Sequence, residues 1–122
     1  MGTFYAGCMI ENHIERTQSI RIPKVLVDTG SEYTWIAEAA LKKIHVVREK
    51  KDIVFVMANG QRVTRSVGFV IIRVGEHFTI DEVVFGEEGD LFLLGARTLE
   101  GLNLTVDPRQ KKLVASGPLP AA

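Results

Sequence analysis

The tetrapeptide Asp-Thr-Gly-Ser at positions 28–31 carries the residue types best suited to chemistry in this chain. Apolar residues lie on both sides of it, in Val25–Val27 and in Tyr33–Ile36. This order predicts a strand that leads into a tight turn, with the carboxylate of Asp28 at its start. Two carboxylates a few ångström apart can share one proton, so that one activates water while the other acts as an acid. The tetrapeptide occurs once in 122 residues, so such a site would need two copies of the chain.

Composition and charge indicate one ordinary globular domain. Hydrophobic residues make up 46% of the chain and charged residues 25%, and the 15 basic residues balance the 15 acidic ones. This balance creates no field that would attract nucleic acid or an anionic membrane. The apolar stretches are far shorter than the roughly 20 residues that cross a bilayer. We therefore expect a single domain over residues 1–122, with neither nucleic acid nor a membrane as a partner.

The cysteine and histidine residues argue against a disulfide or a metal site. Cys8 is the single cysteine and lies in an apolar segment, so we expect a core residue. With no apolar leader at the start of the sequence, a cytoplasmic location is the expectation. His13, His45 and His77 are dispersed and have no cysteine partners at metal-ligand spacing. We expect no metal and no cofactor. A serine nucleophile at Ser31 is disfavoured because no Gly-x-Ser-x-Gly sequence surrounds it.

Short apolar runs rich in Val, Ile and Phe, separated by Gly, Asn and Asp, predict an all-β domain. The expected strands are Thr3–Ile10, Ile14–Ile22, Val25–Val27, Ile53–Met57, Arg62–Ser66, Val67–Val74, Phe78–Phe85, Leu91–Leu94, Leu104–Val106 and Lys112–Val114. Two helices are expected, at Ile36–Ile44 and Ala96–Leu102, and a turn at Glu11–His13. The tail at residues 116–122 is expected to fray.

The pair Asn59-Gly60 gives the strongest hairpin signal in the chain. It lies between two apolar or alternating runs, and both residue types tolerate the positive φ angles of a tight hairpin turn. Taken alone, this pair predicts an ordinary turn without a ligand role. Trp35, which follows the acid turn, is expected in the core or in a pocket wall.

Four features occur in a characteristic order along the chain. They are the acid turn at 27–31, a helix-like stretch after it, the glycine-tipped hairpin in mid-chain, and Leu93-Leu94-Gly95 before a short helix. Together they resemble the retropepsin-like aspartic proteases, a single-domain family that includes retroviral proteases and prokaryotic relatives. Residues 94–108 look most like the prokaryotic branch. The resemblance spans residues 3–114 and implies an all-β fold, a closed acid-protease barrel with one or two short helices.

The resemblance also implies a homodimeric endopeptidase without a cofactor. Asp28 of each chain would face its counterpart across a two-fold axis, and the pair would activate water. The Thr29 hydroxyl would tie the two turns together, and Gly30 would let the backbone turn and aim amide donors at the carboxylate. The hydroxyl of Ser31, beside the outer carboxylate oxygen, would favour the ionised form. An optimum at lower pH than that of Ser31→Ala would follow.

The remaining site residues rest on the same resemblance. The flap that would close over a peptide or protein substrate comprises Met57, Ala58, Asn59 and Gly60. The residues expected to support the acid turn are Leu93, Leu94, Gly95 and Arg97. Arg97 stands where retroviral relatives carry Asn or Asp. Its guanidinium could pair with a carboxylate or backbone carbonyls near the turn, or it could lie exposed on the helix.

A second reading is a module of the same fold that dimerises or binds peptides with little or no proteolysis. The intact acid turn favours the enzyme, because a buried pair of like charges costs stability that an adaptor has no chemical reason to bear.

Overall fold

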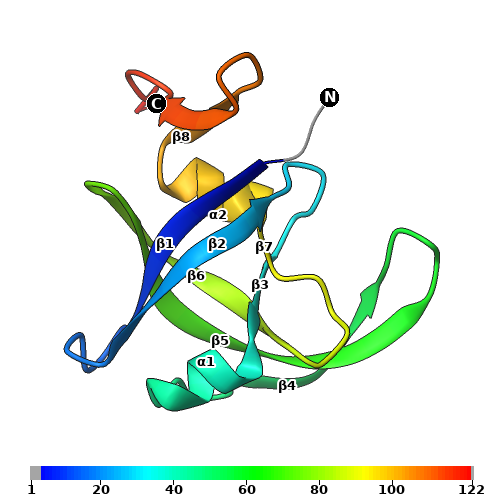
Figure 1. The fold of residues 1–122 in the computed structure, drawn as a ribbon. Helices are drawn as coiled ribbons and strands as arrows, with labels where there is room; N and C mark the ends of the chain where they lie inside the picture. Colours follow the sequence, from blue (N-terminus) through cyan, green and yellow to red (C-terminus); the bar gives the residue numbers. More distant parts are fainter. Residues whose placement is uncertain (1–3, 122) are drawn as a thin grey trace.

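The computed structural model describes residues 4–121 as an all-β domain with two short helices (Figure 1). The strands are β1 (Phe4–Asn12), β2 (Ser19–Val27), β3 (Thr34–Ala37), β4 (Lys50–Val56), β5 (Arg62–Val74), β6 (His77–Gly86), β7 (Leu93–Leu94), β8 (Leu104–Asp107) and β9 (Lys112–Ala115). The helices are α1 (Glu38–Lys43) and α2 (Ala96–Gly101). The all-β class predicted from the sequence is confirmed, and no helix in the described part of the chain is long and apolar enough to span a membrane.

The strands pair into a ring. Their order in the main sheet is β1-β2-β7-β3-β6-β5-β4, and β1 also pairs with β5, which closes the sheet on itself and leaves β4 as an appended edge. Two of the pairings, β2 with β7 and β3 with β6, are parallel. These parallel contacts bring chain segments that are far apart in sequence to one place. The parallel β2–β7 pairing puts the end of β2 beside β7, and an antiparallel contact between Leu93 and Trp35 puts β7 beside the start of β3.

Aliphatic side chains from every part of the ring fill its interior. Cys8 belongs to this core at 2% exposure, as expected, and burial raises the pKa of its thiol to about 11. Each large apolar side chain buried this way contributes about 1.5–3 kcal/mol to folding. The fully buried members are Ile10, Val25, Ile36, Leu41, Val70, Ile72, Val83, Phe85 and Leu94.

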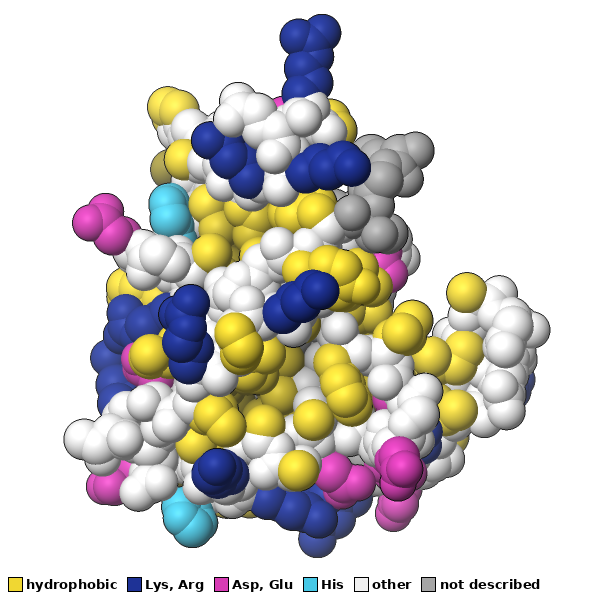
Figure 2. All heavy atoms as spheres, in the orientation of Figure 1, with side chains coloured by type: hydrophobic (Ala, Val, Ile, Leu, Met, Phe, Trp, Pro, Cys, Tyr) yellow, Lys and Arg dark blue, Asp and Glu magenta, His cyan; other side chains and the backbone are white. Residues whose placement is uncertain are grey.

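The hairpin of β8 and β9 lies at one end of the ring, next to α2 and the start of β1 (Figure 1). Its apolar side chains Val106 and Leu113 pack against buried Phe4, Val27 and Leu99. In Figure 2 apolar side chains are visible between this hairpin and the strands below it. The hairpin predicted near the C-terminus is therefore confirmed.

Strand β1 continues further than the sequence indicated. Glu11 and Asn12 were expected in a turn, but both pair with β5, opposite Ile71 and Val70. The Asn12 side chain donates hydrogen bonds to the carbonyls of Ile44 and His45, both at 3.0 Å. Long-range pairing of this kind overrides a local turn signal. Thr3 and Ala122, the outer ends of the expected first strand and of the tail, lie outside the described residues.

Strand β2 runs through Pro23 without a break, although separate segments were expected on either side of it. Proline is tolerated in a strand where the partner bulges. The β1–β2 register shifts between Ala6 and Cys8, and the Gly7 between them faces Pro23 so closely that a Cβ would lie 3.2 Å from its carbonyl oxygen. The predicted strands Arg62–Ser66 and Val67–Val74 likewise form one strand, β5.

Several element boundaries differ from the prediction, and the clearest differences are at α1, β7 and α2. Helix α1 begins at Glu38 rather than Ile36, because Ile36 pairs with Phe85 in the parallel β3–β6 ladder. Strand β7 contains Leu93 and Leu94 alone, and the residues before it form an irregular loop. Helix α2 ends at Gly101, one residue earlier than expected.

Candidate active site

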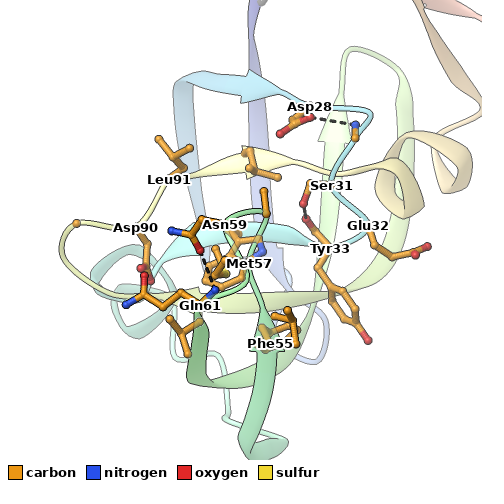
Figure 3. A pocket seen from close by; sticks show the side chains of 17 residues that line it. Asp28, Ser31, Glu32, Tyr33, Phe55, Met57, Asn59, Gln61, Asp90 and Leu91 are labelled. Carbon is orange, nitrogen blue, oxygen red and sulfur yellow. Dashed lines mark hydrogen bonds between the residues drawn. The ribbon is translucent and has the colours of Figure 1, made fainter.

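Asp28 lies immediately after β2, at the first position of a tight turn. Its backbone N–H donates to the Leu94 carbonyl at 3.0 Å, which ties the turn to β7. One carboxylate oxygen, Oδ1, accepts a hydrogen bond from the Gly30 N–H at 2.9 Å (Figure 3). The Ser31 N–H donates to the Asp28 carbonyl at 3.2 Å. A Cβ at position 30 would lie 3.3 Å from Oδ1, so glycine lets the amide approach the carboxylate.

The segment Leu93-Leu94-Gly95 supports the acid turn. Strand β7 pairs with the end of β2, and the Ala96 N–H donates to the Ser31 carbonyl at 2.7 Å. The backbone of Gly95 crosses close to the backbone of Tyr33. A Cβ at position 95 would lie 2.4 Å from the Tyr33 carbonyl oxygen. Real Cβ atoms do not approach an oxygen this closely, so the crossing of the two segments needs glycine.

A buried chain of side-chain hydrogen bonds stabilises this crossing of the two segments. Thr34 and Thr98 have no exposed surface and share a hydrogen bond between their hydroxyls. Thr98 donates its proton to the Asp81 carboxylate at 2.8 Å, so Thr34 must donate to Thr98. Thr34 in turn accepts from the Gly95 N–H at 2.9 Å. The chain joins β6, α2 and β3 and ends on the amide of Gly95. Its residues were not singled out from the sequence.

Thr29 is exposed, and Asp28 is partly exposed beside it. The acid turn is therefore accessible at the surface of the single chain.

Ser31 differs from expectation. Its hydroxyl donates to the Tyr33 carbonyl at 3.1 Å (Figure 3). A hydroxyl has one proton to give, so in this arrangement Ser31 does not donate to the Asp28 carboxylate. For Ser31 to stabilise ionised Asp28 as expected, its hydroxyl would have to give up the bond to Tyr33 and donate to the carboxylate instead.

A cleft of about 580 Å³ opens beside the acid turn (Figure 3). Three segments line it: the chain from the acid turn into β3, the tip of the β4–β5 hairpin, and the loop before β7. The lining residues are Asp28, Gly30, Ser31, Glu32, Tyr33, Trp35, Phe55, Val56, Met57, Ala58, Asn59, Gln61, Val63, Gly89, Asp90, Leu91 and Leu93. Of the residues expected in the site, Thr29, Gly60, Leu94, Gly95 and Arg97 lie outside the lining.

The hairpin tip is a tight turn over residues 57–60. The Gly60 N–H donates to the Met57 carbonyl at 2.8 Å, and Gly60 has a φ of 85°, which glycine adopts without strain. The side chain of Asn59 accepts from the Gln61 N–H at 2.9 Å. The turn predicted from Asn59-Gly60 is thus present, although of the two residues Gly60 alone has a positive φ. The turn faces the acid turn across the cleft.

An aromatic cluster forms the wall of the cleft behind the hairpin. The Phe55 ring meets the rings of Tyr33 and Trp35 edge-on, with centroids 5.3 Å and 5.4 Å apart. Trp35 is both buried and part of the cleft lining, which confirms the expectation of a core or wall residue. Alternation along β4 turns Ile53 and Phe55 toward this cluster, and Met57, directly after the strand, packs there too. That two-residue period could have identified Phe55 from the sequence.

Arg97 takes a third arrangement that neither sequence-based alternative described. Its guanidinium lies 4.8 Å from the centroid of the Tyr33 ring, and its backbone N–H donates to the Glu32 carbonyl at 3.2 Å. Burial lowers the pKa of Arg97, but the charge of Asp81 and the contact with Tyr33 outweigh burial and raise it above its ordinary value. Arg97 therefore makes a cation–π contact with Tyr33, which lines the cleft.

A ring-shaped all-β domain with a turn-held aspartate facing a glycine-tipped hairpin defines the class of acid-protease folds. Residues 19–98 match the family model described as aspartyl protease, which is more than half of the chain and includes the acid turn, the hairpin tip and Leu93-Leu94-Gly95. The chain therefore belongs to the aspartyl protease family, as a retropepsin-like member, and this membership supports a protease-type function. No curated protein matches the chain. Within residues 4–121 no group of three His, Cys, Asp or Glu side chains could hold a metal ion.

Proposed function

We propose that the protein is a homodimeric aspartic endopeptidase in which Asp28 of each chain activates the attacking water. The observation that carries this proposal is that the cleft supplies Asp28 with no second catalytic carboxylate. Two other carboxylates line it, those of Glu32 and Asp90. Glu32 points away from Asp28 (Figure 3), and Asp90 is paired with Arg65. Acid–base hydrolysis by two carboxylates therefore calls for a second chain.

In the proposed dimer the two Asp28 carboxylates share one proton, because two like charges in close contact repel. The charged carboxylate takes a proton from water, and the resulting hydroxide attacks the carbonyl carbon of the scissile peptide bond. The neutral carboxylate donates its proton toward the carbonyl oxygen. When the C–N bond breaks, a proton from the dyad passes to the leaving nitrogen. The partly exposed position of Asp28 supports this proposal, since a partner chain could reach it.

The hairpin of β4 and β5 acts as the flap in this proposal. Its tip residues Met57, Ala58 and Asn59 line the cleft opposite the acid turn. An extended peptide between them would gain backbone hydrogen bonds from the tip and apolar contacts from Phe55 and Met57. Closure of the hairpin would exclude water from the reacting carbonyl.

Cleavage of a peptide library across acidic to neutral pH tests the proposal. Wild-type protein is expected to cleave peptides and to be inhibited by pepstatin. Asp28→Asn is expected to remain folded and dimeric and to lose cleavage by about a thousandfold or more, because the water loses its base. Asp52→Asn is the matched control: Asp52 is an exposed carboxylate with a φ of 58°, which asparagine also tolerates.

The alternative function is a dimerisation or peptide-binding module of the same fold. A wild-type dimer that binds pepstatin but leaves the library uncut would establish this alternative. A chain that stays monomeric at all concentrations would contradict the proposed peptidase mechanism, because one chain supplies one Asp28.

A further inference from the structure

Arg65 and Asp90 form a bidentate ion pair at one end of the cleft. The Arg65 Nε donates to Asp90 Oδ2 at 2.8 Å, and Nη2 donates to Oδ1 at 2.9 Å. Both side chains are largely buried, at 14% and 13% exposure. The remaining guanidinium nitrogen, Nη1, donates to the Thr64 carbonyl at 2.9 Å and lies 3.6 Å from Glu87 Oε1. Parallel charge-assisted bonds of this kind fix orientation as well as distance.

The pair joins two walls of the cleft. Arg65 lies on β5 opposite Ile53 of β4, on the stem of the hairpin and on the face that carries Val63 and Val67. Asp90 lies in the loop at residues 87–92, which forms the wall before β7. The ion pair therefore spans from the stem of the flap to the loop.

Asp90 also shapes its own loop. Its Oδ2 accepts a hydrogen bond from the Glu87 N–H at 2.7 Å, and its backbone N–H donates to the Glu87 carbonyl at 3.0 Å. The hydrogen bonds from Arg65 lower the pKa of Asp90 below its ordinary value, although burial acts in the opposite direction. The carboxylate therefore keeps its charge, and the ion pair persists, to a lower pH than an ordinary aspartate would allow.

A second anchor holds the other end of the loop. The Phe92 ring packs over Gly86, where a Cβ would lie 2.6 Å from the ring. Leu91 stands between the two anchors, lines the cleft, and is 70% exposed. When a ligand covers an exposed apolar side chain of this kind, the apolar surface removed from water stabilises the complex. Arg65 also neutralises Asp90 beside it, so this end of the cleft presents an apolar contact rather than a free negative charge.

We propose that Arg65 and Asp90 are positioning residues that hold the loop at residues 87–92 against the flap stem, so that Leu91 binds an apolar side chain of the peptide substrate. The substrate part of this inference rests on the proposed peptidase function. The mechanical part, the coupling of loop and flap, does not.

Hydrogen exchange tests the coupling without any need for activity. In Asp90→Asn, amide exchange is expected to accelerate by about tenfold both in the loop 87–92 and in the hairpin 53–63, because the charge-assisted bonds are lost. Glu88→Gln removes a charge from the same loop without touching the ion pair and is expected to exchange like wild type. Arg65→Lys keeps the charge but not the bidentate geometry, and its amide exchange rates are expected to lie between those of Asp90→Asn and Glu88→Gln. Exchange that accelerates in the loop alone, or no more than in Glu88→Gln, would overturn the coupling.

Steady-state cleavage tests the role in substrate binding. Asp90→Asn is expected to raise KM by about tenfold while kcat changes far less, since the loop contacts substrate but not the reacting atoms. Leu91→Ala, which cannot disturb the fold at such exposure, is expected to raise KM for peptides with large apolar residues and to leave kcat unchanged. Equal loss of kcat in both variants, or unchanged KM in Leu91→Ala, would overturn this role. Failure of the wild-type protein to cleave would count against the proposed function alone, because the exchange result stands independently.

Discussion

At the scale of single residues, the acid turn depends on a few hydrogen bonds whose donors are now identified. The Asp28 carboxylate accepts a hydrogen bond from the Gly30 N–H, and the Asp28 N–H donates to the Leu94 carbonyl. Ser31 gives its proton to Tyr33 instead. The turn therefore orients the carboxylate through backbone groups, which no side-chain substitution removes directly.

Ser31→Ala is expected to leave the pH dependence of kcat/KM unchanged, because the hydroxyl proton is engaged by the Tyr33 carbonyl. Loss of that bond is expected to lower the free energy of unfolding by about 1 kcal/mol. A pH–rate profile and urea unfolding of both proteins measure the two effects. An optimum displaced to higher pH would instead show that the hydroxyl turns to Asp28 in the active dimer.

At the scale of elements, the site depends on contacts between segments that are distant in sequence. The Asp81–Thr98–Thr34 chain connects β6, α2 and β3 and ends on the Gly95 amide below the acid turn. The Arg65–Asp90 pair connects β5 to the loop before β7. Each connection holds a segment that contributes to the cleft.

Thr98→Val keeps the shape of the side chain but removes its hydroxyl, so the Asp81 carboxylate and the Thr34 hydroxyl lose their shared partner. The expected loss is about 1–3 kcal/mol in the free energy of unfolding, the cost of unsatisfied buried polar groups. Chemical denaturation measures it. Thr105→Val, at an exposed position of β8, serves as the control and is expected to stay close to wild type. Equal stability of the two variants would contradict the importance of the buried chain.

The Arg65–Asp90 pair also predicts how stability changes with pH. Since the pKa of Asp90 is lower in the folded protein than the ordinary value of 3.8, the pair stabilises the fold above that pH and ceases to do so as pH falls through the folded value. Asp90→Asn is therefore expected to be less stable than wild type at neutral pH, by about 1–2 kcal/mol. Unfolding curves recorded from neutral to strongly acidic pH should converge at the acidic end. A constant difference would contradict this linkage.

At the scale of the whole molecule, the ring of strands builds the cleft that contains Asp28. Pairing of β1 with β5 closes the ring, and the hairpin β8–β9 packs at its end. In the proposed dimer, the second carboxylate of the dyad comes from the other chain.

Mixing experiments test this requirement. If both chains must supply Asp28, an equal mixture of wild-type and Asp28→Asn chains, allowed to exchange subunits, should keep about a quarter of the activity of the same total amount of wild type. Chains that work alone would keep about half. The measurement is the initial cleavage rate as a function of the wild-type fraction, which should follow a square law rather than a straight line.

The sequence by itself determined the features that arise from neighbouring residues. The all-β class, the turn at Asp28, the hairpin at Asn59-Gly60 and the C-terminal hairpin all follow from local periodicity and turn chemistry. Tertiary structure alone decided that Glu11 and Asn12 belong to a strand, that Ser31 donates to Tyr33, and that the two polar connections form. Arg65 and Asp90 stand twenty-five residues apart, and Thr34 and Thr98 stand sixty-four apart. Such contacts depend on closure of the ring, and no local pattern encodes that closure.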